Sequence, residues 1–192
     1  MGNVFSDKVA QRREAEGRRR SLSPEVVERW GGEVQRHLAA LPLFTGARAV
    51  AAYDAQKFEV PLAALVAALE ARGVHVVFPR LERGSRVLRF HRPSAWRTGP
   101  LSLREPSPDS PEVAPTDIDV WLVPGVAFTR DGRRLGRGGG YYDTTLERRR
   151  ADATLIGVAF EVSVLHDIAV EAHDVRMHRI ATERGVFSCD PG

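Results

Sequence analysis

A glycine-rich stretch at residues 133–143, read RRLGRGGGYYD, carries residue types that suit the binding and transfer of phosphate groups. Its four glycines, Gly136, Gly138, Gly139 and Gly140, lack the Cβ atom that keeps backbone N–H groups away from a ligand, and they permit positive φ. Successive N–H groups of this kind can form a concave surface that favours anionic oxygens. The stretch therefore predicts a loop that holds phosphate.

The side chains around these glycines extend that chemistry. Arg134 and Arg137 carry planar guanidinium groups whose paired donors match phosphate oxygens. Tyr141 and Tyr142 offer flat ring faces with hydroxyl tips, and Asp143 is a hard oxygen ligand of the kind that Mg²⁺ prefers. A phosphate group, an aromatic ring and a metal ion could meet in this one loop.

A glycine-rich connection can also be no more than a tight turn. The two most common phosphate-binding patterns are absent here. A Walker A loop needs Gly-Lys-Ser or Gly-Lys-Thr, and none follows Gly140, while a dinucleotide fingerprint that starts at Gly136 needs Gly or Ala where Tyr141 stands. The combination of glycines with arginines, tyrosines and an acid is what favours a ligand site over a simple turn.

The longer run PGVAFTRDGRRLGRGGGYYD, residues 124–143, resembles the signature loop of the 5-formyltetrahydrofolate cyclo-ligases, also called 5,10-methenyltetrahydrofolate synthetases. The resemblance implies ATP- and Mg²⁺-dependent ring closure of 5-formyltetrahydrofolate to 5,10-methenyltetrahydrofolate, with release of ADP and phosphate. The route it implies passes through a phosphorylated formyl group, an iminium phosphate. The ATP-binding residues that it implies are Lys8, Arg12, Arg134, Leu135, Gly136, Arg137, Gly138, Gly139, Gly140, Tyr141 and Tyr142.

The resemblance also implies a folate site and a metal site. Arg137 is the implied catalytic residue, and Asp143 and Asp174 are the implied ligands of Mg²⁺. Glu59 matches a substrate-contacting Glu of the family, although the Pro61-Leu62 that follows departs from the usual acid and Thr. The implied substrate-binding residues are Asp54, Glu59, Arg137, Gly138, Gly139, Gly140 and Tyr141. The match extends from Lys8 to Asp174 but is dense only in residues 123–143, and Thr144 replaces the basic residue of many members.

Two helices are predicted before the first strand. Residues 6–20 are strongly charged and free of proline, which indicates a solvated helix with Lys8 and Arg12 on one face. Such a pair alone is typical of an exposed charged surface; the resemblance is what assigns it to the ATP site. Ser23 and Pro24 then mark the start of a second helix, which Pro42 ends.

The apolar segments beyond residue 46 predict a parallel sheet. Predicted strands at residues 47–53 and 74–78 flank a helix at 61–72, which indicates a right-handed βαβ unit with its ligands at the carboxyl ends of the strands. The remaining predictions are strands at 86–90, 120–123, 154–160, 178–182 and 186–189, and a helix at 141–150. Residues 99–116 hold five prolines and predict a surface loop. The resemblance implies one α/β domain over residues 1–192, with an open, mostly parallel Rossmann-like sheet flanked by helices, related to the sugar-phosphate isomerase and CoA-transferase group.

Composition limits the remaining classes. The chain has 192 residues with a net charge of +3, and its only cysteine, Cys189, excludes an intrachain disulfide and fits a reducing compartment. Its longest strongly apolar stretch, residues 60–69, is too short to span a bilayer. We therefore expect a cytoplasmic protein with no membrane or nucleic-acid partner. The ligands that the resemblance implies are ATP and 5-formyltetrahydrofolate, with or without a polyglutamate tail. A monomer is expected, with a dimer as the open alternative.

Two other functions stay open on the sequence alone. A pI of about 9.5 and Arg18-Arg19-Arg20 would suit a nucleic-acid-binding module, although interleaved aromatic residues and a recognisable binding motif are missing. A relative that binds a folate or a nucleotide without turning it over would share the same motifs, and only an activity assay separates it from an enzyme.

Overall fold

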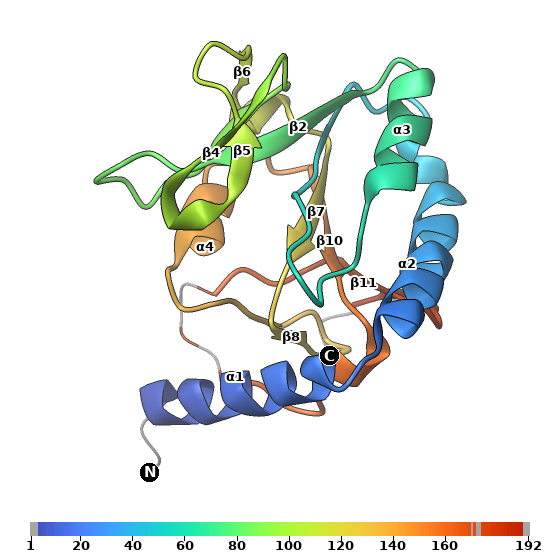
Figure 1. The fold of residues 1–192 in the computed structure, drawn as a ribbon, viewed down its shortest axis with the longest axis vertical. Coiled ribbons are helices and arrows are strands. Elements are labelled where there is room, and N and C mark those ends of the chain that lie inside the picture. The colour runs from blue at the N-terminus through green and yellow to red at the C-terminus, as the bar shows by residue number, and fades with distance from the viewer. Residues whose placement is uncertain (1–3, 170, 172–173, 190–192) are drawn as a thin grey trace.

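The computed structural model of the protein describes residues 4–169, 171 and 174–189. Its central parallel strands are β1 (Ala49–Ala51), β2 (His75–Arg80), β7 (Val120–Pro124), β10 (Thr154–Val158) and β11 (Arg179–Thr182). Antiparallel strands extend both edges, namely β3 (Arg89–His91), β6 (Glu112–Val113) and β12 (Gly185–Ser188). They form one open sheet in the order β12-β11-β10-β7-β1-β2-β3-β6 (Figure 1). The predicted open, mostly parallel sheet is confirmed.

Helices cover the sheet and cross one of its ends. The α-helices are α1 (Val4–Arg20), α2 (Pro24–Ala39), α3 (Ala63–Ala71) and α4 (Tyr141–Leu146), with single 3₁₀ turns at η1 (Pro42–Phe44), η2 (Pro100–Ser102), η3 (Pro115–Asp117) and η4 (Glu161–Ser163). In Figure 1, α2 and α3 lie together on one side of the sheet and α4 lies on the other. The predicted cap of α2 is present, because the Ser23 hydroxyl accepts a hydrogen bond from the Val26 N–H.

The alternation of side chains along β7 divides the core into two layers. Val120 and Leu122 pack with buried residues of α2 and α3. Trp121 and Val123 point to the opposite face, where Leu146 of α4 joins them. Successive residues of a strand face opposite sides of a sheet, so a continuous apolar run buries both faces.

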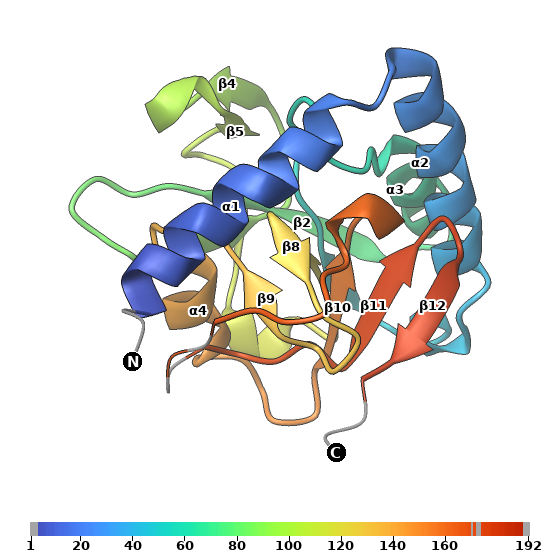
Figure 2. The ribbon, with the colours of Figure 1, turned by 90° about the horizontal axis from the view of Figure 1, so that it is seen from below.

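Two small hairpins stand outside the main sheet. One pairs β4 (Trp96–Thr98) with β5 (Arg104–Pro106), and the other pairs β8 (Ala127–Phe128) with β9 (Arg134–Leu135). Figure 2 shows α1 lying across the second hairpin, where Ala15 packs with Ala127 and Leu135. Each hairpin positions one part of the site.

The structure corrects two predictions of secondary structure. Residues 99–116 were expected to form a surface loop, yet they contain β5 and β6, and Glu105 and Ser110 are buried. The strands form there because the segment finds distant partners, β4 and β3, which local composition does not reveal. The helix predicted at residues 141–150 ends at Leu146. It is therefore shorter than expected, and its dipole at the glycine-rich loop is correspondingly smaller.

Candidate functional site

A cavity of about 650 Å³ opens at the carboxyl ends of β1, β2 and β7. One wall belongs to α1, the opposite wall to the β4–β5 hairpin, and the glycine-rich loop with α4 lies between them (Figure 1). Parallel strands bring their loops to one edge of a sheet, where ligands of this class of fold bind. Every site residue that the resemblance implies lines this cavity: Lys8, Arg12, Asp54, Glu59, Arg134, Leu135, Gly136, Arg137, Gly138, Gly139, Gly140, Tyr141, Tyr142, Asp143 and Asp174.

The glycine-rich loop adopts the conformation that its composition suggested. Gly138 and Gly140 have φ values of +97° and +70°, which other residues rarely adopt. A Cβ atom at Gly139 would lie 2.7 Å from the Tyr141 ring, so the loop also leaves no room for a side chain there. Arg12 of α1 also fastens the loop, because its Nε donates a hydrogen bond of 2.8 Å to the Gly136 carbonyl.

Lys8 provides a buried positive charge on the α1 wall. Its side chain is 7% exposed, and its Nζ donates hydrogen bonds to Asp174 Oδ2 at 2.7 Å and to Glu171 Oε2 at 2.8 Å. Burial by itself would lower the pKa of Lys8, but the hydrogen bonds and charges of these two acids raise that pKa above its ordinary value. The ammonium group therefore stays charged at neutral pH.

Arg134 and Asp143 form a buried ion pair beneath the loop. Arg134 Nη2 lies 2.7 Å from Asp143 Oδ1, and the Arg134 side chain is only 4% exposed. Its guanidinium also lies 5.6 Å from the centre of the Tyr142 ring. The sequence analysis assigned Arg134 to phosphate binding and Asp143 to metal binding. It did not predict that the two side chains pair with each other. Nothing in local spacing signals a contact that a hairpin and the start of α4 create together.

A strained turn presents Glu59 to the cavity. Glu59 Oε2 accepts a hydrogen bond from the Gln56 N–H at 2.9 Å, and Glu59 Oε1 accepts one from Arg137 Nη2 at 2.8 Å. Within the turn from Gln56 to Glu59, Phe58 adopts a φ of +66°, an uncommon value for a bulky residue. Such strain persists only where surrounding contacts enforce it, and it clusters at ligand sites. The turn therefore fixes the position of Glu59, and its carboxylate pairs with Arg137 of the glycine-rich loop.

Two tyrosines form part of the cavity wall. The Tyr53 hydroxyl donates a hydrogen bond to the Val60 carbonyl at 3.0 Å. The Tyr142 hydroxyl is buried and finds no hydrogen-bond partner among the described residues. Burial first, and the nearby charge of Glu59 second, raise the pKa of Tyr142 well above its ordinary value. Both phenols are therefore neutral, and the Tyr142 hydroxyl can still bond to a ligand.

The carboxylates of the cavity suit a metal that is bound together with phosphate. Within the described residues, no group of three or more His, Cys, Asp and Glu side chains forms a ready metal cage. Asp143 and Asp174 both line the cavity, and each shares one of its oxygens with a cation, Arg134 or Lys8. Mg²⁺ is usually held by one or two carboxylates plus substrate phosphates and water, rather than by an all-protein cage. These residues therefore fit Mg²⁺ that enters with a polyphosphate.

Sequence reasoning missed the hairpin wall of the cavity. Ser102, Leu103, Arg104 and Glu105 all line it, from a segment that was expected to be a surface loop. Arg104 Nη1 lies 3.6 Å from Asp54 Oδ1 at this wall. The only available signal was the Glu105-Pro106 pair, which resembles the family pattern.

Fold and site together define an α/β protein with a cavity at the carboxyl edge of parallel strands, lined by a glycine-rich loop and by basic and acidic side chains. The family model of the 5-formyltetrahydrofolate cyclo-ligases matches residues 4–183. The chain therefore belongs to the 5-formyltetrahydrofolate cyclo-ligase family.

Individual relatives agree with this assignment. A 5-formyltetrahydrofolate cyclo-ligase of Mycolicibacterium smegmatis is 34% identical over 178 residues, which cover 88% of this chain and 91% of that protein. The corresponding protein of Escherichia coli K12 is 30% identical over 88% of this chain and 97% of its own length. The NMR structure of Aquifex aeolicus 5,10-methenyltetrahydrofolate synthetase superimposes with a TM-score of 0.84 at 31% identity, covering 96% of this chain and 94% of that one.

Proposed function

We propose that this protein uses ATP to convert 5-formyltetrahydrofolate to 5,10-methenyltetrahydrofolate, with ADP and phosphate as the other products. The observation that carries the proposal is that one cavity gathers the glycine-rich loop, the cations Lys8, Arg12 and Arg137, and the acid Glu59. Family membership supports the same reaction.

Among the described residues, no helix is both long enough and apolar enough to cross a bilayer.

The chemistry explains why a phosphate site and a folate site must adjoin. The oxygen of the formyl group on N5 is a poor leaving group, so N10 cannot displace it directly. In the proposed route this oxygen attacks the γ-phosphorus of ATP, a P–O bond forms, and the bond to the bridging oxygen breaks to release ADP. N10 then attacks the activated carbon, the C–O bond breaks with its electron pair going to phosphate, and N10 loses its proton to water.

The protein's part in this route is positioning and charge stabilisation. In the proposal, N–H groups of residues 136–140 and the cations Lys8 and Arg12 hold the polyphosphate of ATP. Arg137 reaches the transferring phosphoryl group, and Glu59 contacts the pterin, so that the ion pair between them links the two substrates. Removal of one such group typically costs about 2.7–4 kcal/mol of transition-state stabilisation.

Mg²⁺ belongs to the proposal as a partner of ATP. Asp143 and Asp174 would hold it, and its charge would offset the negative charge of the phosphate oxygens. Lys8 and Arg134 hold both carboxylates in place through these ion pairs, whether or not the metal is bound.

The setting of the reaction stays a prediction. The lone Cys189 fits the cytoplasm, and the chain is expected to act as a monomer.

The test is to mix the purified protein with 5-formyltetrahydrofolate and Mg-ATP and to follow the ultraviolet absorbance of the methenyl product together with ADP release. The proposal predicts that the two products appear one to one and only when every component is present. ADP without the methenyl product would keep the ATP site and reject the substrate.

If neither product forms but both ligands bind, the protein is a non-catalytic relative. If no ligand binds and polynucleotide binding shows a steep salt dependence, the nucleic-acid alternative is favoured instead.

A further inference from the structure

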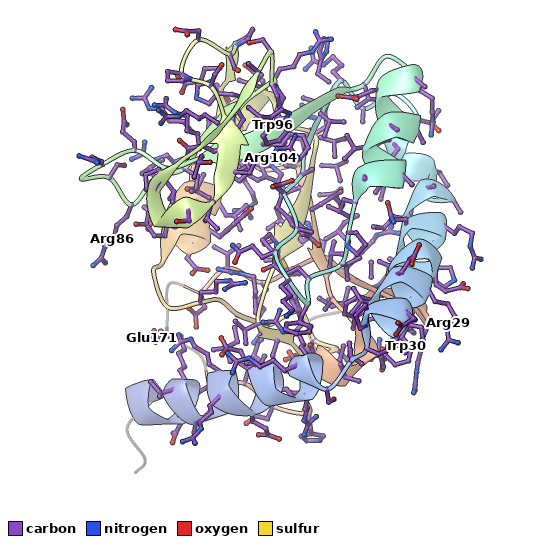
Figure 3. All side chains as sticks on the ribbon, in the orientation of Figure 1. Arg29, Trp30, Arg86, Trp96, Arg104 and Glu171 are labelled. Carbon is purple, nitrogen blue, oxygen red and sulfur yellow. The ribbon has the colours of Figure 1, made fainter. Side chains whose placement is uncertain are left out.

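The β4–β5 hairpin holds an arginine in a fixed orientation. Arg104 Cζ lies 4.2 Å from the centre of the Trp96 ring, so the guanidinium stacks on the indole across the hairpin. Trp96 in turn meets Phe78 of β2 edge to face, at 4.9 Å between ring centres. Figure 3 shows Trp96 and Arg104 next to each other on the hairpin. A stacked guanidinium loses less freedom when it binds a ligand, because part of its ordering is already present.

A buried carboxylate fastens this hairpin to the sheet. The Glu105 side chain is 3% exposed and accepts hydrogen bonds from Arg97 Nη2 at 2.7 Å and from the Leu81 N–H at 3.1 Å. Arg80 of β2 lies 3.6 Å from the same carboxylate. A Cβ atom on Gly99 would lie 2.4 Å from Glu105 Oε2, so the hairpin closes around the acid only because residue 99 is glycine. These contacts hold the β4–β5 hairpin, and with it Arg104, in a fixed position against β2.

The charge of Arg104 is only weakly compensated. Its side chain is 57% exposed, and its distance of 3.6 Å to Asp54 is too long for a hydrogen bond. Two other cations of the cavity form shorter ion pairs. Lys8 of α1 lies 2.7 Å from Asp174, and Arg134 beneath the glycine-rich loop lies 2.7 Å from Asp143. Arg104 is the cation that the hairpin contributes to the cavity lining, and most of its donors still lack a partner among the described residues.

We propose that Arg104 binds a carboxylate of the glutamate tail of the folate substrate. This inference rests on the proposed function. The formyl oxygen must reach the γ-phosphate, which places the pterin end near the glycine-rich loop and α1. The benzoyl-glutamate tail must then extend toward the opposite wall, which is the hairpin (Figure 1). Because a guanidinium binds a carboxylate through two parallel hydrogen bonds, Arg104 recognises the charged end of the tail and not the ring.

Asp54 keeps this arginine oriented when no tail is bound. Its carboxylate lies 3.6 Å from Arg104 Nη1 and attracts the guanidinium without forming a short hydrogen bond. An incoming carboxylate can therefore bind Arg104 without first breaking a strong pair.

The experiment compares two substrates on the wild-type protein and on Arg104→Gln. One substrate is 5-formyltetrahydrofolate, and the other is the N-methyl amide of 5-formyltetrahydropteroate, which keeps the ring and benzoyl group but has no carboxylate. The inference predicts that Arg104→Gln raises KM for 5-formyltetrahydrofolate about fivefold or more, a typical effect of losing a charge-assisted hydrogen bond. KM for the amide, KM for ATP and kcat should stay unchanged.

Matched variants sharpen the result. Arg86→Gln removes an equal charge from an exposed residue that does not line the cavity, and it should change none of these values. Arg104→Lys keeps the charge without the paired donors and should recover part of the loss. An equal rise of KM for both substrates, or no rise for either, would overturn the inference. Failure of the proposed function looks different, because the wild-type protein would then turn over neither substrate.

Discussion

Ion pairs of unequal burial hold the charged side chains of the cavity. The side chains of Arg134 and Asp143 are 4% and 16% exposed, whereas Arg137 is 51% exposed although its partner Glu59 is 9% exposed. An exposed pair contributes little to stability, while breaking a buried pair leaves a charge without compensation. The two arginines of the loop should therefore respond differently to substitution, one through activity and the other through folding.

Arg137→Ala should lower turnover about a hundredfold or more, because it removes a cation from the transferring phosphate. Its free energy of unfolding should change by less than about 1 kcal/mol, because the side chain is half exposed. Steady-state kinetics and urea denaturation measure both quantities, with Arg148→Ala, an exposed residue outside the cavity, as the control. Near-normal turnover would remove Arg137 from the mechanism.

Arg134→Met should instead destabilise the fold by about 3 kcal/mol, because Asp143 loses its partner in a buried position. The second substitution Asp143→Asn, added to Arg134→Met, should restore part of that loss by removing the uncompensated charge. Urea denaturation of both variants checks this. A loss below about 1 kcal/mol in the single variant would mean that water reaches Asp143 and solvates it.

Two adjacent glycines in the middle of α2 have different reasons to be there. A Cβ atom on Gly31 would lie 2.7 Å from the ring of Pro61, so the helix packs against the chain that leads into α3 at this residue. Gly32 has nothing within 4 Å of its Cβ position. Glycine at both positions weakens the helix itself, but only Gly31 has packing that requires it.

Gly32→Ala should therefore raise the free energy of unfolding by about 0.5–1 kcal/mol, the usual gain in a helix interior. Gly31→Ala should lower it, because the added methyl group forces α2 away from Pro61. Thermal or urea unfolding of the two variants side by side tests the contrast. Equal effects of the two substitutions would show that the contact with Pro61 is not close.

One histidine side chain links the start of β11 to β10 through a hydrogen bond that needs a neutral ring. His178 Nδ1 accepts a hydrogen bond from the Leu155 N–H at 3.0 Å, which only the neutral ring can do. Burial first, and the charge of Arg149 second, lower the pKa of His178 below its ordinary value. As pH falls below about 6.5, the unfolded chain takes up a proton that the folded chain resists.

The contribution of His178 to the free energy of unfolding should therefore be complete above about pH 6.5. It should decrease as pH falls toward the lowered pKa of His178. His178→Asn keeps an acceptor and removes the titration, so its stability should be less dependent on pH in this window. Urea denaturation at several pH values measures the slopes. Parallel slopes for both proteins would contradict this role of His178.

The sequence was enough to predict the sheet and, with the family resemblance, the cavity residues contributed by α1, by the loops after β1 and β7 and by Asp174. The burial of β7 on both faces and the loops after β1 and β7 follow from local pattern, and the parallel arrangement brings Asp54, Glu59 and Gly136 to one edge. The roles of these residues as ATP, folate and metal ligands remain predictions.

Contacts between distant segments could not be predicted in the same way. The β4–β5 hairpin depends on the burial of Glu105 against β2, 24 residues earlier at Leu81. The early end of α4 and the pairing of Arg134 with Asp143 likewise result from packing that no local pattern encodes. For that reason the wall that carries Arg104 was missing from the predicted site.

The cavity brings an ATP site and a folate site together so that the formyl oxygen can accept the γ-phosphoryl group. A substrate labelled with ¹⁸O in the formyl group tests this transfer, with the released phosphate analysed by mass spectrometry after turnover with unlabelled Mg-ATP. The proposed route predicts one ¹⁸O atom in each phosphate that forms with the methenyl product. Unlabelled phosphate, with the ¹⁸O in water instead, would contradict it and show that ATP hydrolysis does not activate the formyl group.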